Sequence, residues 1–144
     1  LESLSINNNY LRFLNDNAFN FMPKLKSMHL YGNKLENLSQ NLFQSMPNLN
    51  QINLYSNFLR SIPNKMFLNN SKLTQINLFN NKLDHLKLDT FLGIENTLRT
   101  LNLNENKLKN IKSYYFKNLI KLEDLYLNHN QISTIHSDSF KSLH

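Results

Sequence analysis

Apolar residues return in one fixed pattern along the whole chain. Six units begin at Leu1, Leu25, Leu49, Leu73, Leu98 and Leu122, at spacings of 24, 24, 24, 25 and 24 residues. The fourth, sixth, eleventh and fourteenth positions of every unit are apolar. Self-similarity at such a period is the signature of a solenoid, in which each repeat forms one turn and stacks on the next.

The fourth and sixth positions of each unit are apolar, whereas the positions on either side of them are mostly polar. This alternation predicts a strand of about five residues with one buried face. Stacked units would align their strands into a parallel sheet. The remaining leucines would then fill a continuous core between the sheet and the returning segment of each turn.

Two further positions are invariant. The ninth is asparagine, which we expect to turn the chain out of the strand and to bond backbone groups of neighbouring turns. The predicted ladder is Asn9, Asn33, Asn57, Asn81, Asn106 and Asn130. The nineteenth is phenylalanine, which we expect to stack as a spine on the far side of the core. The predicted spine is Phe19, Phe43, Phe67, Phe91, Phe116 and Phe140.

With these columns the chain resembles the leucine-rich repeat family over its whole length, and its 24-residue units are similar to the "typical" subclass. The resemblance implies an α/β-type solenoid. We expect a curved, right-handed horseshoe segment of six repeats, with a parallel β-sheet on the concave face and an irregular convex side. It also implies an extracellular protein, because that subclass occurs mainly in Toll-type receptors and in secreted immune and adhesion proteins.

Three features depart from the pattern. Asn70 replaces an apolar residue at the twenty-second position, and the fourth unit has one extra residue, so we expect the loop 92–97 to bulge. Neither end shows a polar cap, although the ends of a solenoid must be covered. We therefore expect residues 1–144 to form one uncapped leucine-rich repeat domain within a longer array.

Catalysis is not expected. The 144 residues include no cysteine and only two isolated glycines, so a thiol nucleophile and a glycine-rich phosphate loop are both missing. The five histidines share no column of the repeat, which argues against a zinc site. We predict no catalytic residue, no cofactor and no metal ion.

The formal net charge of +6 raises the question of nucleic acid as a partner. The outward strand positions, however, hold two basic residues against four acidic ones, so phosphate contacts on this face are disfavoured and we predict no nucleic-acid partner. Five lysines gather in the fifth unit, either as a solvated surface or as a contact for an anionic glycan or membrane surface. They are Lys107, Lys109, Lys112, Lys117 and Lys121.

The outward strand face carries three aromatic residues in consecutive units, Tyr31, Tyr55 and Phe79. One strand spacing of about 4.8 Å would separate them, forming an exposed stripe among amides. This composition is typical of recognition surfaces, whereas the alternative is that the rings only stack and stabilise the sheet. The predicted ligand-binding residues are Tyr31, Tyr55, Phe79, His29, Asn53, Asn77, Asn102 and Tyr126.

Two sequons, at Asn37 and Asn69, lie away from the predicted strand face and are candidates for N-glycosylation. Together these features favour a non-catalytic module that binds a protein ligand or co-receptor. We place it outside the cell or on its surface, secreted or in a receptor ectodomain, with a role in innate immunity or cell adhesion. The alternatives are an intracellular scaffold and the substrate-recognition arm of a larger enzyme. The oligomeric state does not follow from the sequence.

Overall fold

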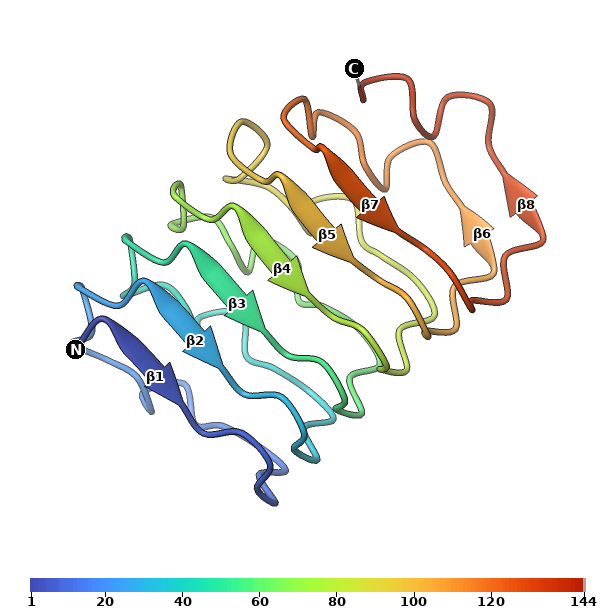
Figure 1. Cartoon of the computed structure of the whole chain (residues 1–144). Coiled ribbons are helices and arrows are strands. Elements are labelled where there is room, and N and C mark those ends of the chain that lie inside the picture. The colour runs from blue at the N-terminus through green and yellow to red at the C-terminus, as the bar shows by residue number, and fades with distance from the viewer. Residues whose placement is uncertain (144) are drawn as a thin grey trace.

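The computed structural model describes residues 1–143. Six short strands lie side by side on one face, and each turn returns behind the sheet (Figure 1). All neighbouring strands are parallel, in the order β1-β2-β3-β4-β5-β7. Their bounds are β1 Ser3–Ser5, β2 Ser27–His29, β3 Gln51–Asn53, β4 Gln75–Asn77, β5 Thr100–Asn102 and β7 Asp124–Tyr126. The predicted solenoid of six repeats with a parallel sheet is thus confirmed.

The register follows the repeat. Leu4 pairs with Met28, Met28 with Ile52, and Ile52 with Ile76, so equal positions of successive units stand opposite one another. Each strand has three residues rather than the expected five. Backbone bonds nevertheless continue past the strand ends: the Asn8 amide donates to the carbonyl of Tyr31 at 2.9 Å.

The segment after each strand is also bonded from turn to turn. The Lys34 amide donates to the Leu11 carbonyl at 2.8 Å, and the Phe58 amide donates to the Leu35 carbonyl at 2.8 Å. In the last two units this extended flank forms a second, two-stranded parallel sheet from β6 (Asn110–Ile111) and β8 (Thr134–Ile135). The alternation at the strand did not predict this second sheet.

The asparagines of the ninth position fasten each turn to the one before it. The Asn57 Oδ1 accepts from the Leu35 amide at 3.1 Å, and its Nδ2 donates at 3.0 Å to the carbonyls of Leu30 and Leu54. Asn33, Asn81, Asn106 and Asn130 bond in the same way.

The first rung of the predicted ladder differs. Asn9 is exposed and donates only to the carbonyl of Asn7, within its own turn. Each ladder asparagine reaches back to the preceding turn, and Asn9 stands in the first one. Within residues 1–143 the bonds between turns are therefore made by the other five ladder asparagines.

The turn out of the strand lies one residue earlier than we expected. The eighth position adopts a left-handed backbone in every unit, and the asparagine at position nine follows it. These residues are Asn8, Gly32, Ser56, Asn80, Glu105 and His129, with φ between 52° and 65°. Only some of these residue types favour that conformation, so the residue types at this position do not predict a left-handed backbone.

The phenylalanine spine is continuous over part of the array. Phe67 stacks on Phe43 at 6.2 Å between ring centroids and on Phe91 at 6.5 Å. Phe116 stacks on Phe140 at 6.0 Å, but among residues 1–143 no stacking joins Phe91 to Phe116. Phe140, in the sixth turn, is 38% exposed.

Among residues 1–143 Phe19 is not stacked on Phe43 either, and the second break, between Phe91 and Phe116, coincides with the long fourth unit. Gly93 has a φ of 99°, and a Cβ there would lie 2.7 Å from the backbone of Leu68. The Gly93 amide also donates to the Glu95 carboxylate at 2.7 Å, which orders the loop that holds the extra residue. Asn70 is fully buried, and its Nδ2 donates to the carbonyls of Phe43 and Met46, so an amide replaces the usual apolar contact with two hydrogen bonds.

Asn81→Ala should lower the free energy of unfolding by about 1–3 kcal/mol, because it leaves buried backbone groups of two turns without partners. Asn96 is exposed and serves as the control, so Asn96→Ala should change stability by less than about 0.5 kcal/mol. Urea unfolding followed by circular dichroism measures both. Equal midpoints for the two variants would contradict a structural role for the ladder.

Candidate functional site

The three aromatic residues of the strand face contact one another. The rings of Tyr31 and Tyr55 are parallel within 9° at 4.3 Å between centroids, and Phe79 is tilted by 55° at 6.3 Å from Tyr55. All three side chains are half-buried, so the expectation of an exposed Phe79 was wrong. The strand spacing explains this, since rings about 4.8 Å apart cover each other's faces.

Amides beside the stripe shape the backbone that carries it. The Asn77 Oδ1 accepts from the Phe79 amide at 3.1 Å, the Asn53 Oδ1 from the Tyr55 amide at 3.4 Å, and the Asn102 Oδ1 from the Asn104 amide at 3.0 Å. Each asparagine therefore caps the end of its own strand with its oxygen. The sequence pattern predicts these residues only as ligand contacts; the signal for the capping role is an asparagine two residues before a turn.

The remaining predicted residues lie at two places on the face. His29 is half-buried on β2, and its strand neighbour in the register is Asn53 on β3. Tyr126 is 41% exposed on β7, which is separated from β4 by β5. The sheet therefore groups His29 with the amides beside the aromatic stripe, whereas Tyr126 stands apart from it.

Charges on the strand face are largely paired at its edge. Lys26 contacts Glu2 at 2.9 Å, and Arg99 forms an ion pair with Glu123. Within residues 1–143 the face has no other basic side chain, while Glu105 and Asp124 are exposed. The middle of the face is thus neutral and its last two units are acidic.

The pKa of Tyr55 is raised above 10.0, first by burial, and then by the charge of Tyr31 and a hydrogen bond with it. The burial of the Tyr55 hydroxyl disfavours its phenolate because water is excluded. A negative charge on Tyr31 would disfavour the Tyr55 phenolate further. The Tyr55 hydroxyl therefore stays protonated throughout the physiological range.

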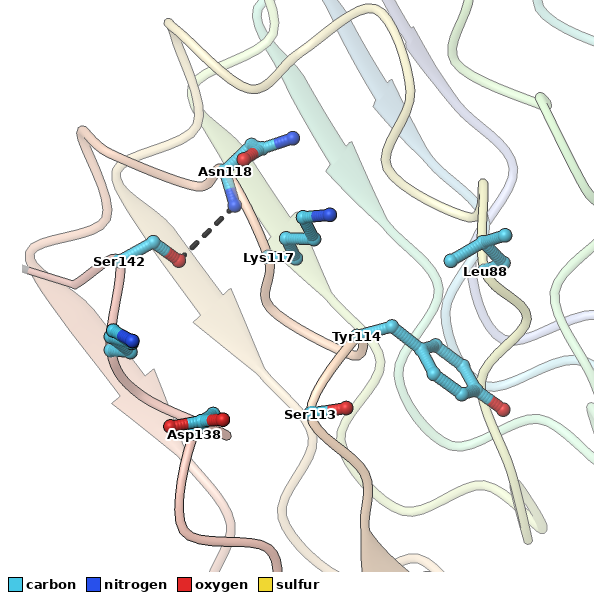
Figure 2. A pocket seen from close by; sticks show the side chains of 8 residues that line it. Leu88, Ser113, Tyr114, Lys117, Asn118, Asp138 and Ser142 are labelled. Carbon is cyan, nitrogen blue, oxygen red and sulfur yellow. Dashed lines mark hydrogen bonds between the residues drawn. The ribbon is translucent and has the colours of Figure 1, made fainter.

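The lysines of the fifth unit do not form one cluster. A hollow of about 380 Å³ lies in the returning turns of units four to six, and only Lys117 of the five contributes to it, together with Lys141 (Figure 2). The Lys112 ammonium lies 5.7 Å from the centroid of the Tyr114 ring, and Lys121 lines a separate hollow. Side chains that are close in sequence diverge here because the chain curves sharply between them.

Figure 2 shows how the hollow is built. The Asn118 amide donates to the Ser142 Oγ at 3.1 Å, which ties the fifth turn to the sixth. Leu88 and Tyr114 lie together at one side, and Asp138 lies at the other. An acid, two amines and a short hydrophobic wall give this hollow no single chemical preference.

Residues 1–143 contain no group of three or more histidine, cysteine or acidic side chains placed to hold a metal ion. In the same part of the chain we find no helix with the length and hydropathy that crossing a membrane requires.

The sequence matches the BspA-type leucine-rich repeat region, in six copies, over residues 1–123 and 79–144. No protein of curated function matches it significantly. Among solved structures, the chain is 31% identical to Toll in the Drosophila Toll–Spatzle complex, with a TM-score of 0.88. It is 25% identical to TLR13 in a complex with ssRNA13, with a TM-score of 0.74. It aligns over 97% and 98% of its own length but spans only 18% and 23% of those chains.

A titration tests the environment of Tyr55. The difference between the absorbance titrations of the native protein and Tyr55→Phe should have its midpoint above pH 10, as the raised pKa requires. Because the folded pKa is the higher one, the pair contributes stability below pH 10 that is lost as the pH rises through the folded value. A midpoint at or below 10 in protein that circular dichroism shows to be folded would contradict the stacked arrangement.

Proposed function

We propose that this chain, a member of the BspA-type leucine-rich repeat family, is a non-catalytic recognition module whose strand face binds a protein ligand or co-receptor. The observation that carries the proposal is the aromatic stripe of Tyr31, Tyr55 and Phe79 in the middle of a neutral surface. The same fold can carry many functions, so the argument rests on this surface and not on the fold.

The stripe has the physical properties of a binding anchor. Aromatic side chains offer a large contact area, and mutual stacking already restricts their rotation, so binding costs little further entropy. Each of the three side chains is only partly buried, so part of its surface remains available to a partner. Beside it, the Nδ2 groups of Asn53 and Asn77 can donate hydrogen bonds, since only their oxygens are used to cap the strands.

The alternative is that the rings only hold the sheet together. The stacking of Tyr31 on Tyr55 supports it, because cross-strand aromatic pairs contribute about 0.2–1 kcal/mol to a sheet. The orientation of Phe79 favours recognition, since its ring is tilted by 55° from Tyr55 and does not continue the parallel stack. The two roles are compatible, and affinity and stability measurements on the same variants separate them.

The solved relatives bind different classes of partner: TLR13 was solved with ssRNA13, and Toll with Spatzle. For the strand face of this chain we favour a protein. Its two basic residues, Lys26 and Arg99, are already paired with Glu2 and Glu123, so they are not free for phosphates. We therefore propose no nucleic-acid contact on this face.

We further propose an extracellular or cell-surface location and a role in innate immunity or cell adhesion. The similarity to Toll supports this location. Asn37 and Asn69 are both exposed and both lie away from the strand face, where a glycan would leave the aromatic stripe open. The Asn69 Nδ2 donates to the Gln44 carbonyl at 3.3 Å, so this side chain is oriented along the surface.

Alanine substitution tests the recognition surface. A photo-crosslinking residue at position 104, beside the stripe, identifies the partner. The Kd of the partner for the native protein and for each variant is then measured by interferometry. Tyr55→Ala and Phe79→Ala should each weaken binding by about 1–4 kcal/mol, as central aromatic anchors do. The control is Phe21→Ala, because Phe21 is 93% exposed and lies outside the strand face. If both stripe variants bind as tightly as the native protein, the recognition surface lies elsewhere.

Glycan analysis tests the location. When the protein is expressed through the secretory pathway of an animal cell, intact mass should show one added glycan at Asn37 and one at Asn69. Each should disappear in Ser39→Ala and Ser71→Ala respectively, which remove the sequons but keep the asparagines. A protein from its native host that carries no glycan at either position would favour the intracellular scaffold.

A further inference from the structure

A second surface runs along the flank that follows the strands. The tenth and twelfth positions of each unit point away from the core, because the eleventh position is buried between them. We call this surface the flank ridge. Over the first five units it consists of Tyr10, Arg12, Lys34, Glu36, Phe58, Arg60, Lys82, Asp84, Lys107 and Lys109.

The backbone under the flank ridge is firmly held. The amides of Lys34, Phe58, Lys82 and Lys107 each donate to the carbonyl of the eleventh residue in the preceding unit, at 2.8–2.9 Å. Side chains at equal positions of successive units are therefore stacked in one line at a constant spacing. A row of charges on such a support can match a linear partner that has regularly placed charges of opposite sign.

Charge is concentrated on the flank ridge. It holds six basic and two acidic residues, which is +4 of the +6 net charge of the whole chain. Among residues 1–143 the ion pairs are Lys26–Glu2, His85–Asp84 and Arg99–Glu123, so no basic residue of the ridge is neutralised by a direct ion pair. Asp84, one of its two acids, is contacted instead by His85 at 2.5 Å.

Aromatic rings hold two of these cations in place. The Lys34 ammonium lies 4.9 Å from the centroid of the Tyr10 ring, and the Lys82 ammonium lies 4.3 Å from that of Phe58. Such contacts restrict a side chain that would otherwise sample many rotamers. Tyr10 is 81% exposed and Phe58 39% exposed, so neither ring is required by the core.

We propose that the flank ridge binds a linear sulfated polysaccharide. Sulfate groups carry fixed negative charges along an extended chain, and the ridge presents ammonium and guanidinium groups in a line with few competing acids. Single-stranded nucleic acid fits less well, because bases bind proteins by stacking on aromatic faces. Here an ammonium group already lies over the ring of Tyr10 and over that of Phe58.

This site goes beyond the proposed protein-binding function and lies on a different surface from the aromatic stripe. It also changes the assignment of the fifth-unit lysines. Lys107 and Lys109 belong to the flank ridge, whereas Lys117 belongs to the hollow in the returning turns. A glycan on the ridge would leave the strand face free, so either proposal can fail without the other.

The test uses heparin as the probe. The ridge variant carries Lys34→Ala, Lys82→Ala and Lys107→Ala, and the matched control carries Lys117→Ala, Lys121→Ala and Lys141→Ala. Both lose three positive charges, so a difference between them reports position and not net charge. The ridge variant should bind heparin on the order of 100-fold more weakly at low salt, since each lysine at an anionic surface contributes about a factor of five.

Salt-gradient elution from a heparin column and calorimetry with a defined sulfated oligosaccharide give the readout, and circular dichroism shows that both variants are folded. The control should elute close to the native protein. Equal weakening of the two variants would overturn the proposal, because binding would then follow overall charge. A single-stranded oligonucleotide that displaces heparin at lower concentration, and whose binding depends on the same three lysines, would overturn it in favour of nucleic acid.

Discussion

The structure depends on hydrogen bonds that each turn can make only with its neighbours. A strand of three residues cannot satisfy its own backbone, and the chain behind it forms no helix within residues 1–143. The buried asparagine at the ninth position resolves this. In the case of Asn57, one amide accepts from the preceding turn and donates to both that turn and its own, so it pairs backbone groups of Leu30, Leu35 and Leu54.

This constraint also determines which side chains lie next to one another on the surface. Every turn is held in the same register relative to the next. The residues at one position of the unit therefore form a line along the molecule. The seventh position becomes the stripe of Tyr31, Tyr55 and Phe79, and the tenth becomes a line in which Tyr10 and Phe58 each precede a lysine of the next unit. A recognition surface can therefore be changed by surface substitutions alone, without altering the core.

The same constraint sets what could be predicted from the sequence. Parallel pairing in equal register follows from the repeat period, and β1 to β5 have it, as in the pairing of Leu4 with Met28. The left-handed eighth position was not predictable, since Ser56 and Glu105 do not favour that conformation and adopt it only because the ladder requires the turn. The partial burial of Phe79 also depends on a three-dimensional contact that no column of residue types encodes, whereas the strand-capping role of Asn77 has a local signal, an asparagine two residues before a turn.

The net charge follows from the sequence, but which cations are paired and which are free follows only from the structure. A net charge of +6 suggests a polyanion, yet the strand face pairs its cations, Lys26 and Arg99, with Glu2 and Glu123. The flank ridge leaves its cations free and orients two of them over aromatic rings. Two partners of different chemistry would then meet different sides of one rigid array. The segregation of free cations from the aromatic stripe thus allows each surface to be selective without a separate domain for each partner.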